Sequence, residues 1–277
     1  MDPGPLETAC FLAGALSVTL TDAADHPVLE PAPGCTPLWP SVRLSALFAE
    51  QNPQRVAALL STFLDEPLPI HRFDEVRDRP WEREWLEDFR PMRFGRRLCV
   101  SPHGAPAPDA DTVVVRLDPG LAFGTGSHPS TRLCLEWLEA ASLNGLEAID
   151  YGCGSGILSI AAVRLGARIV VAVDIDPQAL TATRDNAARN GVGEYVVTRT
   201  PDEPLAAADV LLANILSGPL IELAPRFATL VRPRGSVVLA GLIVSQAGAV
   251  TLAYRPWFDI RPFGAHDDWV CLHGVRR

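Results

Sequence analysis

The sequence predicts an α/β protein: a Rossmann-like, mostly parallel sheet with helices on both faces, preceded by a small α+β domain. Two observations indicate this fold class. From residue 113 onward, strand-like apolar runs alternate with helix-like runs, which implies crossovers between parallel strands. In the stretch AIDYGCGSGILSIAA at 148–162, three glycines occupy alternate positions between a strand-like and a helix-like run. With 48% hydrophobic residues, the chain of 277 residues can fill the core that such a sheet needs.

The alternating region divides into elements by its apolar runs and its turn residues. A strand at 113–117 leads through the glycine-rich loop DPGLAFGTGSHPST into a helix that ends near residue 140. Strands are expected at 147–151, at 169–174, in a run that ends at 214, and at 237–243, and helices at 157–165, 177–190, 218–231 and 245–254. Two closing strands, 257–263 and 268–275, are expected to form a β-hairpin at one edge of the sheet.

The front of the chain, residues 1–79, predicts a smaller α+β domain. A helix at 6–16 runs into a strand, and a second strand is expected at 43–50. Asn52 is typical of a helix N-cap, and the proline that follows it is typical of the first helical position. An alternating run at 71–76 predicts a third strand, which gives the order α-β-β-α-β. A split βαβ sandwich would need a further strand before the first helix, where only five residues stand.

Charge and composition separate the parts of the chain. The densely charged run Pro80–Phe89 is typical of an exposed connecting helix, so we expect a linker at 80–91 between domains at 1–79 and 92–277. The net charge is −9, and residues 1–91 carry 15 acidic residues and only 7 arginines. A negative chain argues against a nucleic-acid surface, whereas its acidic front would attract a basic partner.

The basic and cysteine residues exclude several classes of protein. All 24 basic residues are arginine, which excludes an enzyme that forms a Schiff base through lysine. The six cysteines form no CxxC pair, no apolar run reaches the length of a bilayer span, and the start is not signal-like. These features predict a cytoplasmic protein without a membrane partner. Cys153, inside the glycine turn, is either a small turn-filling residue or a nucleophile, and no metal-ligand spacing is found.

Candidate ligand-binding residues follow the carboxyl ends of predicted strands, where open α/β sheets bind their ligands. Gly152, Gly154 and Gly156 have no Cβ, so the backbone can approach a ligand closely. Asp174 ends the strand RIVVAVD, 22 residues after Gly152. An acidic side chain at about this spacing accepts hydrogen bonds from ribose hydroxyls. Asn214 ends the strand DVLLAN and would lie at the same edge of the sheet.

The spacing of the glycines distinguishes between two nucleotide ligands. A dinucleotide fingerprint, G-x-G-x-x-G, would have its third glycine at position 157, where this chain has isoleucine. Asp150 beside the turn would repel a pyrophosphate and attract an ammonium group. S-adenosylmethionine has an ammonium group and a ribose but no phosphate. We therefore interpret the turn as a site for S-adenosylmethionine, with an NAD-binding oxidoreductase as the alternative.

Asn214 is the candidate catalytic residue. Methyl transfer to an amine is an in-line displacement, so the lone pair of a neutral nitrogen must point at the methyl carbon. An amide oxygen and nearby backbone carbonyls can hold the amine hydrogens and fix that direction. The alternative is that Asn214 only caps the segment that follows it. His128 also has two interpretations, a general base or the start of a helix, and Thr131 would lie in the first turn of that helix.

Five motifs are long enough to compare with a known family: DPGLAFGTGSHPST, IDYGCGSGILSIAA, AVDIDPQAL, RDNAARNGV and ANILSGPLIELAP. Together with WEREWLEDFRPMRFG and EPAPGCTPLW, they resemble the PrmA family of ribosomal protein L11 methyltransferases. The resemblance covers nearly the whole chain. Its first and last motifs are more specific than the glycine turn, which class I methyltransferases share.

This resemblance implies a class I methyltransferase domain with a seven-stranded sheet, a helical linker and a ferredoxin-like domain that recognises the ribosomal protein. It also implies transfer of methyl groups from S-adenosylmethionine to lysine ε-amino groups and the N-terminal α-amino group of protein L11. We expect a monomer, without nucleic acid, and another protein or a small molecule is the alternative substrate. In the family, the ferredoxin-like domain begins with a β-strand, but only five residues precede the first expected helix of this chain. Either the given start is too late or the domain has one strand fewer.

The family's donor contacts correspond to four positions of this chain, each with the matching residue type: Thr131, Gly152, Asp174 and Asn214. The turn and the loop add three donor-site candidates, Asp150, Gly154 and Phe123. Phe123 begins the part of the loop, 123–131, that could fold over the pocket.

Overall fold

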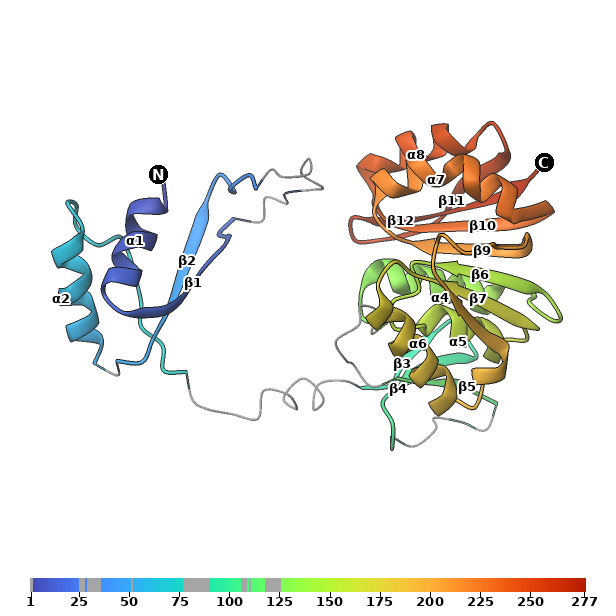
Figure 1. Ribbon diagram of the computed structural model, residues 1–277, viewed down its shortest axis with the longest axis horizontal. Coiled ribbons are helices and arrows are strands. Elements are labelled where there is room, and N and C mark those ends of the chain that lie inside the picture. Colours follow the sequence, from blue (N-terminus) through green and yellow to red (C-terminus); the bar gives the residue numbers. More distant parts are fainter. Residues whose placement is uncertain are drawn as a thin grey trace. The chain divides into compact units, whose positions relative to one another are not determined.

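The computed structural model describes residues 2–24, 28, 36–50, 52–76, 90–105, 109, 111–117 and 126–277. The chain divides between Arg79 and Pro80 into two compact units, a front unit and a rear unit, each considered by itself (Figure 1). The connecting helix expected at Pro80–Phe89 lies outside the described residues, and so does Phe123. Both therefore stay predictions.

The described part of the front unit has two helices that pack on one face of a two-stranded sheet (Figure 1). Its elements are α1 (Gly4–Leu12), β1 (Ala15–Asp22), β2 (Val42–Phe48) and α2 (Pro53–Phe63). The two strands pair antiparallel. Alternate residues of both strands, among them Val18 and Leu44, pack against Cys10 of α1 and Val56 and Leu60 of α2. This small core explains the alternation of exposed and partly buried residues along β1 and β2.

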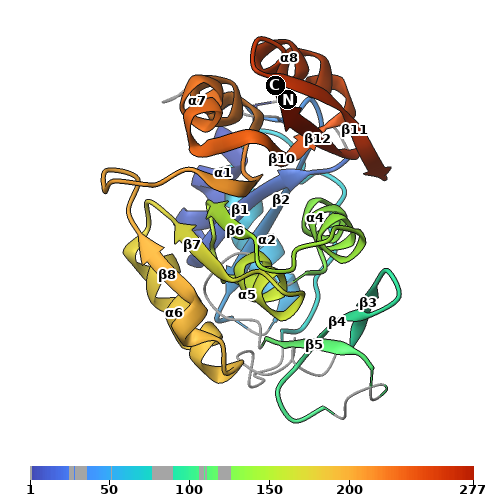
Figure 2. The same ribbon diagram turned by 90° about the vertical axis from the view of Figure 1, so that its right-hand side faces the viewer.

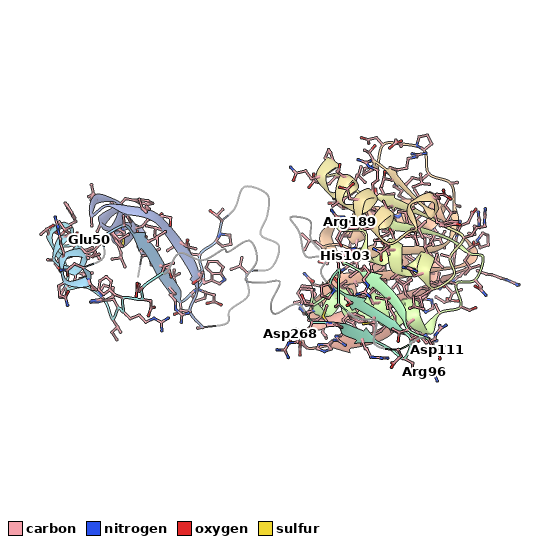
Figure 3. The ribbon with its side chains drawn as sticks, turned by 90° about the horizontal axis from the view of Figure 1, so that it is seen from below. Glu50, Arg96, His103, Asp111, Arg189 and Asp268 are labelled. Atoms are coloured by element: carbon pink, nitrogen blue, oxygen red, sulfur yellow. The ribbon has the colours of Figure 1, made fainter. Side chains whose placement is uncertain are left out.

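The predicted cap of α2 is confirmed. The side-chain oxygen of Asn52 accepts hydrogen bonds from the backbone N–H groups of Gln54 and Arg55, at 3.0 and 3.2 Å. Glu50, labelled in Figure 3, accepts a bond from the backbone N–H of Asn52 at 3.1 Å and pairs with the Arg55 guanidinium at 3.2 Å. These bonds satisfy donors that the first turn of a helix leaves without a partner.

The strand predicted at His71–Val76 is wrong, because these residues pair with no strand of the described chain. Phe73 is 41% exposed and Val76 is 63% exposed, so the alternating pattern does not correspond to a buried face. A period-two pattern describes one segment alone, whereas a strand also needs the hydrogen bonds of a neighbour. The described front unit therefore has the order α-β-β-α.

A seven-stranded sheet forms the centre of the rear unit, in the order β11-β12-β10-β9-β6-β7-β8. Its strands are β6 (Glu147–Tyr151), β7 (Ile169–Val173), β8 (Val196–Arg199), β9 (Ala208–Asn214), β10 (Val231–Ile243), β11 (Phe258–His266) and β12 (Trp269–Arg276). All neighbours from β10 to β8 are parallel, whereas β12 is antiparallel to both β10 and β11. The mostly parallel sheet with a closing hairpin is confirmed.

Helices cover both faces of this sheet (Figures 1 and 2). One face carries α4 (Pro129–Ala140), α5 (Ile157–Arg164) and α6 (Pro177–Arg189), and the other carries α7 (Ser217–Leu230) and α8 (Ala247–Tyr254). Two apolar cores result, one for each face. The strand order reverses between β6 and β9, so the carboxyl ends of these strands and of β7 meet where open sheets bind their ligands.

A second, three-stranded sheet in the rear unit consists of β3 (Met92–Phe94), β4 (Leu98–Ser101) and β5 (Val113–Arg116). The strand expected at 113–117 therefore exists, but it pairs with β4 and does not enter the main sheet. Three short strands, β3, β4 and β8, of three or four residues each, are not among those expected from the sequence.

Candidate functional site

The turn between β6 and α5 has a backbone that favours glycine. Gly152, Gly154 and Gly156 have φ angles of 83°, 54° and 79°, in the left-handed region. The backbone N–H groups of Gly152 and Cys153 donate to the carbonyl oxygen of Val173, at 2.7 and 3.0 Å. The turn is therefore fastened to the end of β7, immediately before Asp174.

Asp174 is half-buried beside this turn. Its Oδ2 accepts a hydrogen bond from the backbone N–H of Gly154 at 2.9 Å, and its Oδ1 accepts one from the backbone N–H of Asp176 at 3.0 Å. Asp176 in turn caps α6 by accepting from the backbone N–H of Gln178 at 2.8 Å. Because each carboxylate oxygen can accept two bonds, Asp174 is held in place and can still bind a ligand.

Asp150 lies behind the turn and is completely buried. Its Oδ2 accepts hydrogen bonds from the backbone N–H and the hydroxyl of Ser159, at 3.0 and 2.7 Å. Its Oδ1 has no hydrogen-bond partner among the described residues. Burial raises the pKa of Asp150 from 3.8 to about 6, although the bonds from Ser159 act in the opposite direction. This carboxyl group ties β6 to α5 through its Oδ2, while its Oδ1 is buried.

Asn214 and Thr131 come from distant parts of the sequence and meet at the same edge of the sheet. Nδ2 of Asn214, at the end of β9, donates to Oγ1 of Thr131, in the first turn of α4, at 3.2 Å. Asn214 is half-buried and Thr131 is buried. Since the amide nitrogen donates to Thr131, the amide oxygen is the atom that can accept a bond from an amine. Ile215, next to Asn214, contacts Gly152 and so brings this pair to the glycine turn.

His128 begins α4, and its geometry favours the helix-start interpretation. Its Nδ1 accepts a hydrogen bond from the backbone N–H of Ser130 at 3.2 Å and lies 2.7 Å from the Ser130 hydroxyl oxygen. The imidazole ring packs edge-on against Trp269, with 4.4 Å between ring centroids. Burial lowers the pKa of His128, which favours the neutral imidazole that can cap the helix through Nδ1.

Two buried asparagines, one in α6 and one at its end, connect the turn to the small sheet, and neither is among the candidate residues expected from the sequence. Asn190 accepts from the backbone N–H of Arg116 at 2.7 Å and donates to the carbonyl oxygens of Arg116 and Asn186, at 2.6 and 2.8 Å. Asn186 donates to the carbonyl oxygen of Ser155, in the turn, at 2.9 Å. Their spacing of four residues within RDNAARNGV, on one helix face, is the signal that could have found them.

Cys153 is the cysteine of the glycine turn. Burial raises its pKa well above the usual range, and the Thr183 hydroxyl lies 3.3 Å from its sulfur. A buried thiol that stays protonated suits the turn-filling interpretation better than that of a nucleophile. Among the described residues, no group of three or more His, Cys, Asp or Glu side chains could hold a metal ion. None of the described helices has the length and apolar character that crossing a bilayer requires.

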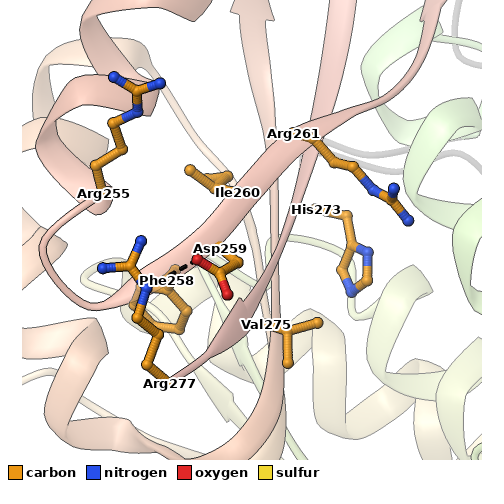
Figure 4. Close-up of a pocket in the computed structure, with 8 residues that line it drawn as sticks. All are labelled: Arg255, Phe258, Asp259, Ile260, Arg261, His273, Val275 and Arg277. Atoms are coloured by element: carbon orange, nitrogen blue, oxygen red, sulfur yellow. Dashed lines mark hydrogen bonds and ion pairs between the residues drawn. The ribbon is translucent and has the colours of Figure 1, made fainter.

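A hollow of about 530 Å³ lies at the other end of the sheet, around the start of β11 and the end of β12 (Figure 4). Arg255, Arg261 and His273 line it, and Arg277 pairs there with Asp259 at 2.8 Å. Of the candidate donor-site residues that the structure describes, none lines this hollow.

Comparisons with known proteins identify close relatives. The family profile described as "Ribosomal protein L11 methyltransferase (PrmA)" matches residues 5–277. A protein of that name from Azotobacter vinelandii is 49% identical over 277 residues, which are 99% of this chain and 95% of that protein. Another, from Pseudomonas putida strain GB-1, is 50% identical over 274 residues, which are 98% of this chain and 94% of that protein.

A solved structure supports the same relationship. The crystal structure of ribosomal protein L11 methylase from Lactobacillus delbrueckii subsp. bulgaricus is 32% identical to this chain, with a TM-score of 0.62. The match spans 68% of this chain and 100% of the chain in the Lactobacillus structure. The rear unit has the class I methyltransferase fold, and the family profile spans both units. This chain belongs to the ribosomal protein L11 methyltransferase (PrmA) family.

Proposed function

We propose that this protein transfers methyl groups from S-adenosylmethionine to lysine ε-amino groups and the N-terminal α-amino group of ribosomal protein L11. The observation that carries the proposal is the hydrogen bond from Asn214 to Thr131 beside the glycine turn. It leaves an amide oxygen free for an amine at the edge of the sheet where a nucleoside would bind. The names of the relatives supply the protein substrate.

The residues at the turn suit the methyl donor. Asp174 accepts two backbone bonds and retains lone pairs for the two ribose hydroxyls. Gly152 and Gly154 let the backbone approach the ligand, and Thr131 and Asn214 complete the donor site. When bound, S-adenosylmethionine supplies an electrophilic methyl group on a sulfonium sulfur.

Asp150 and Phe123 are also proposed for the donor site, each for a different reason. Asp150 would act from behind the turn, where its negative charge favours an ammonium group. Because Asp150 is completely buried, we assign it an electrostatic role and not a direct contact through Oδ2, which Ser159 occupies. Phe123 remains a candidate on the sequence alone, as a residue of the loop that precedes α4.

Asn214 would hold and orient the methyl acceptor. Its amide oxygen can accept a hydrogen bond from a neutral amine and so aim the nitrogen lone pair at the methyl carbon. Thr131 fixes the amide group through its hydroxyl oxygen. The chain's own contribution to the reaction is therefore orientation and exclusion of water, and no general base is required once the amine is neutral.

The front unit is proposed to recognise the substrate. Its residues 1–79 carry 11 acidic residues and 5 arginines, a net negative charge that would attract a basic protein. We propose that the enzyme acts as a monomer in the cytoplasm. The five cysteines within the described residues are free thiols, in keeping with a reducing compartment.

The test is transfer of a tritiated methyl group from S-adenosylmethionine to purified ribosomal protein L11, with donor binding measured by calorimetry on the same sample. Label in the protein is expected, together with saturable donor binding. If the donor binds but L11 stays unlabelled, the substrate assignment is rejected, and label in another protein of a ribosomal extract would identify the alternative. Binding of NAD in place of S-adenosylmethionine would reject the donor assignment.

A further inference from the structure

We propose that Gly241, with Ile215 against it, is a positioning residue for Asn214. The absence of a side chain at Gly241 lets the backbone of Ile215 lie directly on β10, and this sets where the Asn214 amide stands. The inference rests on the proposed role of Asn214 in methyl transfer.

The contact between Gly241 and Ile215 is made by backbone atoms. A Cβ at position 241 would lie 2.4 Å from the carbonyl oxygen of Ile215 and 2.9 Å from both its carbonyl carbon and its nitrogen. Gly241 also has a φ of 82°, a conformation that residues with a side chain rarely adopt. Backbone atoms cannot rotate away as the end of a side chain can, so any larger residue at position 241 must displace the segment that follows Asn214.

The pairing of β10 brings Gly241 to this place. The parallel register between β10 and β9 ends at Ala240↔Asn214, one residue before Gly241. From Leu239 to Leu242, β10 advances by three residues, while its antiparallel neighbour β12 advances by only two. The extra residue in β10 is a β-bulge. Bulges bend a strand and are frequent next to active sites, where they re-aim the neighbouring side chains. At this bulge, β10 lies against the backbone of Ile215, the residue that follows the end of β9.

Ile215 is held from a second side by the glycine turn. A Cβ at Gly152 would lie 2.3 Å from Cγ2 of Ile215, so the Ile215 side chain rests on Gly152 while its backbone rests on Gly241. Asn214 is the preceding residue, and its amide donates to Thr131 at 3.2 Å. A shift of Ile215 would therefore move Asn214 relative to Thr131, although Gly241 touches neither of them through a side chain.

The first experiment compares Gly241→Ala with Gly145→Ala. Gly145 has a similar φ of 75°, but a Cβ there would meet no atom within 4 Å, so this variant isolates the cost of the backbone conformation. For Gly241→Ala we expect kcat to fall about tenfold or more, the scale of a small misplacement of a catalytic group, and the Kd of S-adenosylmethionine to change less than about threefold. Gly145→Ala should keep both values near those of the unmodified protein.

A double-mutant cycle separates positioning from general damage to the fold. If Gly241 acts through Asn214, Gly241→Ala should lower kcat in the unmodified protein but add little to the loss already caused by Asn214→Ala. A loss that is fully additive, or unchanged turnover in Gly241→Ala, would overturn the proposal.

Two further measurements keep the proposal testable in every case. If Gly241→Ala does not fold, Ile215→Ala tests the step from Ile215 to Asn214: it removes the side-chain contact with Gly152 that holds Ile215 in place. Turnover equal to that of the unmodified protein would show that the position of Ile215 does not matter for Asn214, which contradicts the proposal. If the unmodified protein leaves L11 unlabelled, the substrate assignment fails separately. A crystal structure of Gly241→Ala then decides, since the proposal expects the bond between Asn214 and Thr131 to break and an intact bond would refute it.

Discussion

The two carboxylates of the proposed donor site, Asp174 and Asp150, differ in the hydrogen bonds that their oxygen atoms already accept within the protein. Asp174 and Asp150 are both carboxylates at strand ends, 24 positions apart in the sequence. Asp174 is half-buried and bonded to two backbone N–H groups, whereas Asp150 is completely buried and bonded only to Ser159 among the described residues. Under the proposed function, Asp174 would bind the ligand directly, whereas Asp150 would act through the fold and through its charge.

Removing the Asp174 side chain should weaken donor binding. Asp174→Ala is expected to cost about 1.5–3 kcal/mol, the scale of lost hydrogen bonds to a charged acceptor. Calorimetry with S-adenosylmethionine measures this directly. Asp185→Ala, on the exposed face of α6, is the matched control and should leave the Kd unchanged. An unchanged Kd for Asp174→Ala would show that the ribose assignment is wrong.

The burial of Asp150 should appear in the pH dependence of stability. Its pKa in the folded protein is about 6, above 3.8, so the folded state holds this proton more tightly than the unfolded chain. The stabilising effect is therefore complete at low pH and is lost as the pH rises from about 4 to 6, by about 3 kcal/mol in all. Denaturant unfolding should show this fall relative to Asp150→Asn, which cannot titrate. Parallel pH curves for the two proteins would contradict the prediction.

At the scale of elements, helix α4 links the two sides of the site. Its first residues carry Thr131, its start is capped by His128, and His128 packs on Trp269 of β12. The placement of Thr131 against Asn214 therefore depends on how α4 begins.

Replacing the cap tests this dependence. His128→Ala is expected to lower the free energy of unfolding by about 0.5–2 kcal/mol and to reduce turnover, because α4 loses the acceptor for the Ser130 N–H. His128→Asn supplies another cap and should recover most of both losses. Thermal unfolding and methyl-transfer rates measure the two effects. A general base would give the opposite result, with His128→Asn as inactive as His128→Ala.

The elements that the sequence predicts are those set by local patterns. The Asn52 cap and the glycine turn depend on residues within a few positions of one another, and both form as expected. The strand at His71–Val76 and the sheet that β5 joins depend on distant partners, which a pattern in one segment does not contain. The hydrogen bonds between Asn190 and Arg116 also join residues far apart in the sequence. The motif RDNAARNGV is therefore visible in the sequence, but its contact with β5 is not.

At the scale of the whole molecule, charge is divided between the two parts of the chain. The front unit, residues 1–79, holds 11 acidic residues and 5 arginines, and the rear unit holds 22 and 19. Negative charge is therefore denser in the front unit, whereas the proposed methyl-transfer residues belong to the rear unit. This division suits an enzyme that attracts a basic protein with one unit and modifies it with the other.

Salt should therefore affect substrate recognition more than chemistry. Raising the ionic strength is expected to raise the KM for ribosomal protein L11, because salt screens the attraction between an acidic surface and a basic substrate. The kcat at saturating substrate should change little. Initial rates measured at low and high salt give both values. A KM that does not respond to salt would contradict an electrostatic role for the front unit.

Methyl transfer through Asn214 can be measured by mass spectrometry of ribosomal protein L11 after incubation with S-adenosylmethionine and either the unmodified enzyme or Asn214→Ala. We expect mass increments of whole methyl groups on lysine side chains and the N-terminus with the unmodified enzyme, and far smaller increments with Asn214→Ala although it still binds the donor. An unmodified L11 mass with the donor bound, or equal methylation by both enzymes, would contradict methyl transfer through Asn214.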